Sequence, residues 1–420
     1  MTTGAPQPGP LTGVNVADFS WIAAGPMSAR WLADYGATVV KVESMGKVDG
    51  LRKGPPFLKG KFAVNQSAYF AACNINKYGI TMNLNKPSGL EAARRLITWS
   101  DVLIENFTPG QMAKWGLDYE SVKKINPNII MMSLSIQGQT GPLASLPGLG
   151  PMLAGLVGFA NLTGYPDGPP SGVSIVYTDA TSPQFASLAL SAALDYRART
   201  GKGQYIDLSQ FETSVYLLGD AILDWTCNGR NQIRAGNRLM AGGLPRAAPH
   251  GAYPCKGTER WVAIGVFTQE EWRSFCRVIG SPAWTRERRF ATVAERCKNS
   301  DALDALVAQW TLTQEAEDVM RGMQGAGISA GAVHDQRGLY EDPQLNHRGH
   351  YGFIEHTEMG RHHTEMLAPR LSLTPGSVRM PAPCLGEHSE LVYKRFLRYT
   401  NAEYDELIAK GVVELWEAGA

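Results

Sequence analysis

The chain of 420 residues lacks the features that mark several large protein classes. Its 40 Lys and Arg residues are balanced by 39 Asp and Glu residues, so it lacks the basic excess of a nucleic-acid-binding protein. No apolar run reaches the ~18 residues of a membrane span. The first residues, MTTGAPQPGP, show no basic-then-apolar signal pattern. We therefore expect a cytoplasmic protein whose ligand is a small molecule, with neither nucleic acid nor membrane as a partner.

Several short motifs are also missing. The six cysteines form no CxxC pair, which predicts free thiols in a reducing compartment. Five histidines lie between residues 347 and 363 without HExxH or cysteine spacing. We interpret this segment as a polar loop and expect no metal. No GxSxG elbow supports a serine hydrolase. The turn Ala23-Ala24-Gly25-Pro26 lacks GxGxxG, so an NAD site with Glu43 on the ribose is a weak alternative.

The first half of the sequence does have a regular alternation of two patterns. Helical patterns alternate with short β-branched runs, which cover Val14–Phe19, Thr38–Glu43, Gly79–Leu84, Val102–Phe107 and Ile129–Ser135. Strands that alternate with helices form parallel sheets through right-handed crossovers. The sequence therefore predicts an α/β fold with a Rossmann-like, doubly wound parallel sheet.

Changes in composition divide the rest of the chain. Residues 226–249 are basic and glycine-rich, and strand-like and helical patterns resume at His250. We predict a first part of a large domain over residues 1–225 and a linker over 226–249. A smaller α+β domain follows over 250–330, and residues 331–420 form a return linker and the C-terminal part of the large domain.

One segment of the middle region combines a rigid turn with a carboxylate. After the turn PDGPP (166–170), the apolar run Val173–Tyr177 leads to Asp179 and then to a helix predicted at about Ser182–Arg199. Asp179 fits the role of a helix N-cap. A carboxylate held ionised at a helix N-terminus is also suited to be a nucleophile in covalent catalysis. The residue pattern leaves both roles open.

Eleven motifs, spread in order over residues 11–413, resemble the family III CoA-transferases, which include formyl-CoA and crotonobetaine/carnitine CoA-transferases. They read LTGVNVADFSWIAAGP, YGATVVKVE, NINKYGITMNL, DVLIENFTPG, GQTGP, PDGPP, RTGKGQYIDLS, HGAYPCKG, AGISAGAVHD, DPQL and LGEH. The resemblance implies a ring-shaped chain in an interlocked dimer, either a homodimer or a heteromer with a related subunit. It implies coenzyme A, carried as an acyl-CoA, and a free carboxylic acid as the substrates, with no metal.

The resemblance also assigns residues. The family nucleophile lies nine residues after the DGPP turn, which is Asp179 here. The expected contacts of coenzyme A are Ile22, Ala24, Met82, Asn85, Asn106, Phe107, Thr108 and Lys114. The expected substrate-side residues are Trp21, Ala23 and Tyr69, with Gly242 and Gly243 as a mobile lid. Asp179 would attack the donor thioester, and the reaction would pass through aspartyl anhydrides and an aspartyl-CoA thioester.

The departures from the family pattern bear on the substrate. Formyl-CoA transferases have His and Gln where this chain has Trp21 and Ala23. A less polar site with an indole favours a bulky or aromatic acid, such as benzylsuccinate, with succinyl-CoA as donor. A cationic acid such as carnitine stacked on Trp21, or Trp21 packed in the core, are alternatives. A 2-methylacyl-CoA racemase is a further alternative, although it needs a His near Leu149, as is a non-catalytic CoA-binding subunit.

Overall fold

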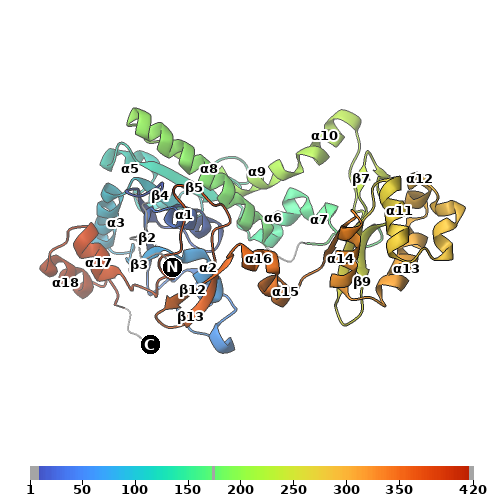
Figure 1. The fold of residues 1–420 in the computed structure, drawn as a ribbon. Coiled ribbons are helices and arrows are strands. Elements are labelled where there is room, and N and C mark those ends of the chain that lie inside the picture. Colours follow the sequence, from blue (N-terminus) through green and yellow to red (C-terminus); the bar gives the residue numbers. More distant parts are fainter. Residues whose placement is uncertain (1–8, 173–175, 416–420) are drawn as a thin grey trace. The chain divides into compact units, whose positions relative to one another are not determined.

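The computed structural model describes residues 9–172 and 176–415 (Figure 1). They divide into two compact units. The first contains the described parts of 1–157, 174–217 and 343–420, and the second contains those of 158–173 and 218–342. No described helix has both the length and the hydrophobicity that crossing a bilayer requires.

The first unit is built on a six-stranded parallel sheet, as predicted. Its strands are β1 (Asn15–Asp18), β2 (Thr38–Glu43), β3 (Lys77–Thr81), β4 (Val102–Glu105), β5 (Ile130–Ser135) and β6 (Tyr205–Ser209). The strand order is β3-β2-β1-β4-β5-β6. The order reverses between β1 and β4, and ligands of open α/β sheets bind at the carboxyl ends of the strands beside such a switch. The Rossmann-like prediction is confirmed.

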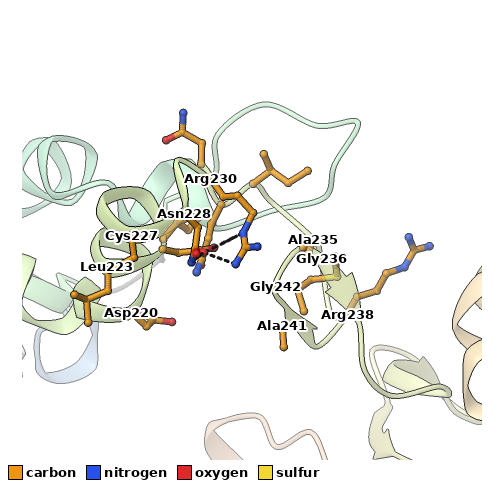
Figure 2. A pocket seen from close by; sticks show the side chains of 17 residues that line it. Asp220, Leu223, Cys227, Asn228, Arg230, Ala235, Gly236, Arg238, Ala241 and Gly242 are labelled. Atoms are coloured by element: carbon orange, nitrogen blue, oxygen red, sulfur yellow. Dashed lines mark hydrogen bonds and ion pairs between the residues drawn. The ribbon is translucent and has the colours of Figure 1, made fainter.

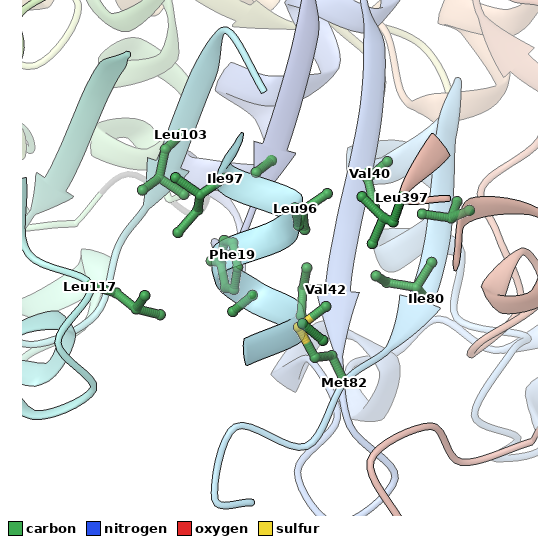
Figure 3. Packing of buried hydrophobic residues seen from close by; sticks show 14 of the residues in the cluster. Phe19, Val40, Val42, Ile80, Met82, Leu96, Ile97, Leu103, Leu117 and Leu397 are labelled. Carbon is green, nitrogen blue, oxygen red and sulfur yellow. The ribbon is translucent and has the colours of Figure 1, made fainter. Parts of the chain in front are cut away.

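Helices cover both faces of this sheet. On one face, α1 (Ala24–Asp34) and α8 (Tyr177–Thr200) pack against β1, β4 and β5. On the other face, α3 (Pro87–Trp99) and the C-terminal segment that includes α18 (Asn401–Ala409) enclose a second apolar cluster (Figure 3). Two-sided burial explains why the strands read as nearly continuous apolar runs. The remaining helices of this unit are α2 (Ala68–Asn74), α4 (Gln111–Lys114), α5 (Tyr119–Ile125), α6 (Gly150–Val157), α9 (Gln210–Val215), α16 (Pro343–His347) and α17 (Ser389–Leu391).

The second unit has a three-stranded antiparallel sheet with the order β11-β10-β9. Its strands are β9 (His250–Pro254), β10 (Trp261–Gly265) and β11 (Ser329–Ala332). The helices of this unit are α7 (Phe159–Leu162), α10 (Gly219–Asn228), α11 (Gln269–Val278), α12 (Val293–Lys298), α13 (Ser300–Thr311), α14 (Ala316–Gly325) and α15 (Gln336–Glu341). The strands and helices bury a separate apolar core. A smaller α+β part is therefore present.

Two segments that the sequence predicted as irregular contain strands. Residues 226–249 include a short hairpin of β7 (Met240–Ala241) and β8 (Leu244–Pro245). The histidine-rich segment includes β12 (Tyr351–His356) and β13 (Gly360–Glu365), which pair antiparallel. The loop interpretation was wrong for the histidine-rich segment, because the alternation of a half-exposed hairpin is hard to see among polar side chains. Within the described ranges, no three His, Cys, Asp or Glu residues form a group that could hold a metal ion.

Candidate active site

The turn between β1 and α1 has a strained backbone that is held from two sides. Ile22 has a φ of 64°, a left-handed conformation that β-branched residues rarely adopt. Its backbone N–H donates to Oδ1 of Asp49 at 2.9 Å. The Trp21 N–H donates to Oδ1 of Asn106 at 2.7 Å, and the Asn106 amide donates back to the Trp21 carbonyl at 2.7 Å. The first turn and the turn after β4 are thereby locked together.

Gly25 explains why this junction needs a glycine. A Cβ at position 25 would lie 2.4 Å from the Cβ of Ser20 and 3.1 Å from the Cγ of Asn106. Any larger residue would push apart the two turns that the Asn106 amide joins. A glycine is needed at position 25 because the two turns approach each other closely there, although the sequence has no GxGxxG motif.

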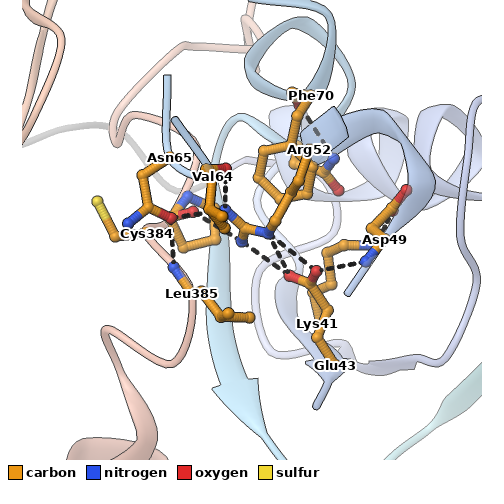
Figure 4. Close-up of polar contacts among 12 residues, drawn as sticks. Lys41, Glu43, Asp49, Arg52, Val64, Asn65, Phe70, Cys384 and Leu385 are labelled. Carbon is orange, nitrogen blue, oxygen red and sulfur yellow. Dashed lines mark hydrogen bonds and ion pairs between the residues drawn. The ribbon is translucent and has the colours of Figure 1, made fainter. Parts of the chain in front are cut away.

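Three fully buried ion pairs lie near this turn, and Figure 4 shows the pair of Arg52 and Glu43. Lys41 pairs with Asp49, Arg52 with Glu43 and Lys77 with Asp18, each with a nitrogen-to-oxygen distance of 2.8 Å. Three cations and three anions cancel, as burial of charge requires. This network supports the Asp49 carboxylate that holds the Ile22 N–H.

The pKa values within the network follow from burial and pairing. Burial opposes the charged form of Glu43, but the Arg52 guanidinium, the Lys41 ammonium and the Asp49 N–H together outweigh it and lower the pKa of the Glu43 carboxyl. Burial lowers the pKa of Lys77 to about 8, although the Asp18 carboxylate opposes this shift. Because Arg52 binds both oxygens of Glu43, at 2.9 and 2.8 Å, that carboxylate is committed to the network. The alternative of Glu43 as a ribose-binding acid of an NAD site therefore has no structural support.

A cavity of about 310 Å³ lies at the carboxyl ends of β2, β3 and β4, beside the strand-order switch. Four of the predicted coenzyme A contacts line it: Met82, Asn85, Phe107 and Thr108. The side chain of Met82 also packs in the apolar core (Figure 3). The structure thus brings together residues that lie in two separate motifs of the sequence.

The other predicted contacts lie outside the described wall of this cavity. Asn106 does not line the cavity, but its side chain makes two hydrogen bonds to the backbone of Trp21, which does. Ile22 is 43% exposed, whereas Ala24 at the start of α1 is buried. Lys114 is an exposed residue at the end of α4. Instead, the cavity has Lys47 and Trp115, which sequence reasoning missed.

Trp21 belongs to this cavity and forms an aromatic row with Phe107 and Trp115. The ring centroids lie 5.6 Å apart for Trp21 and Phe107 and 5.2 Å for Phe107 and Trp115, both edge to face. The indole N–H of Trp21 reaches the Val42 carbonyl at 3.3 Å. Trp21 is therefore half-buried in a cavity wall, and the alternative of a core residue was wrong. Its predicted neighbour on the substrate side, Ala23, is buried.

Asp179 lies in the first turn of α8. Its Oδ1 accepts a hydrogen bond from Nε2 of Gln210 at 2.9 Å. Gln210 opens α9, directly after β6. Burial raises the pKa of the Asp179 carboxyl, and the Gln210 amide partly offsets this rise. Burial is the main cause that raises the pKa of the Tyr69 phenol on α2, and the side chains of Cys73 and Asp179 add to this rise.

The N-cap interpretation of Asp179 was wrong. The cap is Val176, and α8 begins at Tyr177, ahead of the predicted Ser182. Pro183 lies inside the helix, and it has no N–H to donate to the carbonyl of Asp179 four residues before it. Sequence reading places such a proline at a helix start, which explains the misplaced boundary. Residues 173–175 of the apolar run before Asp179 lie outside the described residues.

We predict that Gln210 sets the acidic limb of the activity profile. The expected nucleophile, Asp179, must be ionised to attack, so activity should fall as pH drops through its raised pKa. Gln210→Ala removes the donor that lowers this pKa, and Gln210→Glu adds a like charge of the same shape. The acidic limb of kcat/KM against pH should therefore move upward from the native enzyme to the Ala variant and further in the Glu variant. If the native enzyme and the two Gln210 variants are equally stable and their acidic limbs of kcat/KM coincide, Gln210 does not have this role.

The predicted lid residues belong to the second unit. Gly242 and Gly243 form the two-residue turn of the β7–β8 hairpin, with φ values of 60° and 79°. Such left-handed positions at a hairpin turn favour glycine. Both glycines line a cavity of about 810 Å³ within this unit, where Arg230 pairs with Asp224 at 2.6 Å (Figure 2). Their role as a lid stays a prediction.

Comparison with known proteins identifies the family. The profile described as CoA-transferase family III matches residues 11–389. The chain belongs to CoA-transferase family III. It is 32% identical to the succinyl-CoA–D-citramalate CoA-transferase of Chloroflexus aurantiacus, over 97% of this chain and 98% of the relative. It is also 32% identical to the succinate–glutarate CoA-transferase of Agrobacterium fabrum, over 91% and 94%.

The solved structures agree with this assignment. A CaiB/BaiF family protein from Brucella suis superimposes with a TM-score of 0.84 at 32% identity, over 93% of this chain and all of that one. The protein is thus an enzyme that transfers coenzyme A between an acyl-CoA and a carboxylic acid. The resemblance and the enzyme class expected from the motifs are confirmed.

Proposed function

We propose that this family III CoA-transferase moves coenzyme A from succinyl-CoA to a second dicarboxylic acid, with Asp179 as the nucleophile. The supporting observation is the setting of Asp179: a largely desolvated carboxylate, bound by Gln210. Within the described residues around it, Gln210 is its hydrogen-bond donor and no cation pairs with it. An unpaired carboxylate freed from part of its water is a better nucleophile than a solvated one.

The reaction proceeds in four displacements. A carboxylate oxygen of Asp179 attacks the carbonyl of the donor thioester. The C–S bond breaks, CoA thiolate departs, and a mixed anhydride of Asp179 and the donor acid forms. The thiolate attacks the Asp179 carbonyl, which frees the donor acid and forms an aspartyl-CoA thioester. The acceptor carboxylate attacks the carbonyl of that thioester, the C–S bond breaks, and a second anhydride forms as the CoA thiolate is released. Attack of the thiolate on the acceptor carbonyl gives the new acyl-CoA and restores Asp179, with no net change in protons.

The setting of Asp179 suits these intermediates. Anhydrides and thioesters of aspartate hydrolyse if water reaches them, so burial protects the acyl group between displacements. The Gln210 amide holds one oxygen of Asp179 and leaves the other for attack. When oxygen bears charge in a displacement, the same N–H stabilises it.

Dicarboxylic acids are the proposed acceptors. The two relatives named above are transferases for succinyl-CoA with citramalate and for succinate with glutarate. The expectation of an aromatic acid rested on Trp21, and that indole lines the cavity of the predicted coenzyme A contacts. A short dicarboxylate is therefore better supported than benzylsuccinate, which is itself a substituted succinate.

A screen of acids with succinyl-CoA tests this proposal. Each acid is incubated with enzyme and succinyl-CoA, and new thioesters are measured by mass spectrometry. We expect turnover with citramalate, malate or glutarate and little with monocarboxylic acids of similar size. Preference for benzylsuccinate would instead support an acyl site that binds an aromatic acid. Exchange of the α-proton of a 2-methylacyl-CoA in deuterated water, without transfer, would instead indicate a racemase.

We also propose that the chain works as an interlocked dimer, with residues 226–249 and the return linker that begins at residue 331 as its linkers. Helix α10 has no buried residue, and its side chains Leu223 and Trp225 are 61% and 54% exposed. Apolar surface of this extent on one helix favours a protein partner. A second copy is the simplest partner, and a related subunit is the alternative.

The free cysteines among the described residues support a reducing, cytoplasmic location.

A further inference from the structure

The cavity beside the first turn is lined by aromatic and amide side chains and by one cation. Its two described charged residues are Glu43 and Lys47. Glu43 is neutralised by Arg52, so it contributes little net charge. Among the described ion pairs none contains Lys47, and its ammonium keeps its charge available for a ligand.

The position of Lys47 is fixed by the backbone. Residues 44–47 form a tight turn directly after β2, in which the Lys47 N–H donates to the Ser44 carbonyl at 3.2 Å. The ammonium of Lys47 lies 5.5 Å from the centre of the Trp21 ring. A cation over an indole is attracted to its face. The contact holds the ammonium above the aromatic row without neutralising it.

We propose that Lys47 is the cation of this cavity that binds a phosphate group of the coenzyme. The inference rests on the proposed binding of coenzyme A in this cavity. The aromatic row offers a surface for a planar base, and the amides of Asn83 and Asn85 offer polar contacts. A phosphate needs a cation beside these, and Lys47 supplies it. Lys114, the cation that the resemblance suggested, is outside the described wall.

Equilibrium binding tests this role without knowledge of the acid substrate. Titration calorimetry compares the native enzyme with Lys47→Met, which keeps much of the chain length and loses the charge. Lys47→Met should bind CoA roughly tenfold more weakly, as loss of one charge-assisted contact predicts. Lys47→Arg should restore most of the affinity, because it keeps the charge. Lys53→Met, which removes an exposed lysine after the same strand, should bind as the native enzyme does.

Dephospho-CoA identifies the phosphate. If the loss in Lys47→Met disappears with dephospho-CoA, Lys47 binds the 3′-phosphate. If Lys47→Met loses the same affinity for CoA and for dephospho-CoA, Lys47 binds the diphosphate that both ligands share. In either case the loss should shrink at high salt. Unchanged CoA affinity in a stable Lys47→Met variant would overturn the inference. If the native enzyme binds no CoA at all, the proposed function fails instead.

Discussion

Replacement of Asp179 by alanine is expected to abolish CoA transfer, with a fall in kcat of roughly 10⁴-fold or more, as loss of a covalent nucleophile produces. Asp179→Asn should be nearly as inactive, because an amide cannot form the anhydride. Steady-state assays with succinyl-CoA and an accepted acid measure this. The affinity for CoA should change little, since the cavity of the predicted coenzyme A contacts contains neither Asp179 nor Gln210.

The matched control for this variant lies on the same helix. Asp195 of α8 is an exposed aspartate that pairs with Arg199 at 2.7 Å. Asp195→Ala should keep full activity. Substantial transfer by a folded Asp179→Ala enzyme would remove Asp179 from the mechanism. Loss of transfer in both variants would indicate a folding defect, which circular dichroism separates from a chemical one.

The largest expected effect on stability comes from Arg52. Arg52→Met leaves the Glu43 carboxylate buried without its partner, and also removes bonds to Asn65 at 2.9 Å and to the Pro383 carbonyl at 3.1 Å. We expect the free energy of unfolding to fall by about 3–5 kcal/mol, the cost of breaking a buried ion pair from one side. Chemical denaturation followed by circular dichroism measures it.

An exposed pair of the same chemistry provides the comparison. Arg199 and Asp195 lie 2.7 Å apart but are each 66% exposed, so Arg199→Met should cost less than about 1 kcal/mol. The double variant Glu43→Gln/Arg52→Met should regain part of the lost stability, because it buries no unpaired charge. Equal effects at the two sites would show that burial of the Arg52 pair carries no special weight.

The sheet could be predicted from the sequence because its strands are local signals. Val39, Val40 and Val42 of β2 form a β-branched run that is buried on both faces, and five such runs with helical patterns between them predict a doubly wound parallel sheet. Lys41 and Glu43 interrupt this run with charges. Charged residues in a strand that is buried on both faces indicate internal ion pairs, so the buried pairs of Lys41 and Glu43 could have been predicted from the sequence.

The site could be predicted only in part because its residues meet in space. Asp179 follows a motif of the family, and only the resemblance singles it out as the expected nucleophile. Gln210 lies 31 residues later and reaches Asp179 only because α8 and α9 pack together. Lys47 carries no local pattern, since a lysine in a turn is ordinary until the turn is placed beside Trp21. The cap of α8 was misread because Pro183 resembles a helix start.

Trapping of the covalent intermediate tests the central claim most directly. The enzyme is incubated with succinyl-CoA, treated with hydroxylamine, digested and analysed by peptide mass spectrometry. The account predicts a hydroxamate on Asp179, formed only when the acyl-CoA is present and absent from Asp195 and from Asp179→Asn. Turnover of succinyl-CoA with no modification of Asp179, or a hydroxamate on another carboxylate, would contradict it.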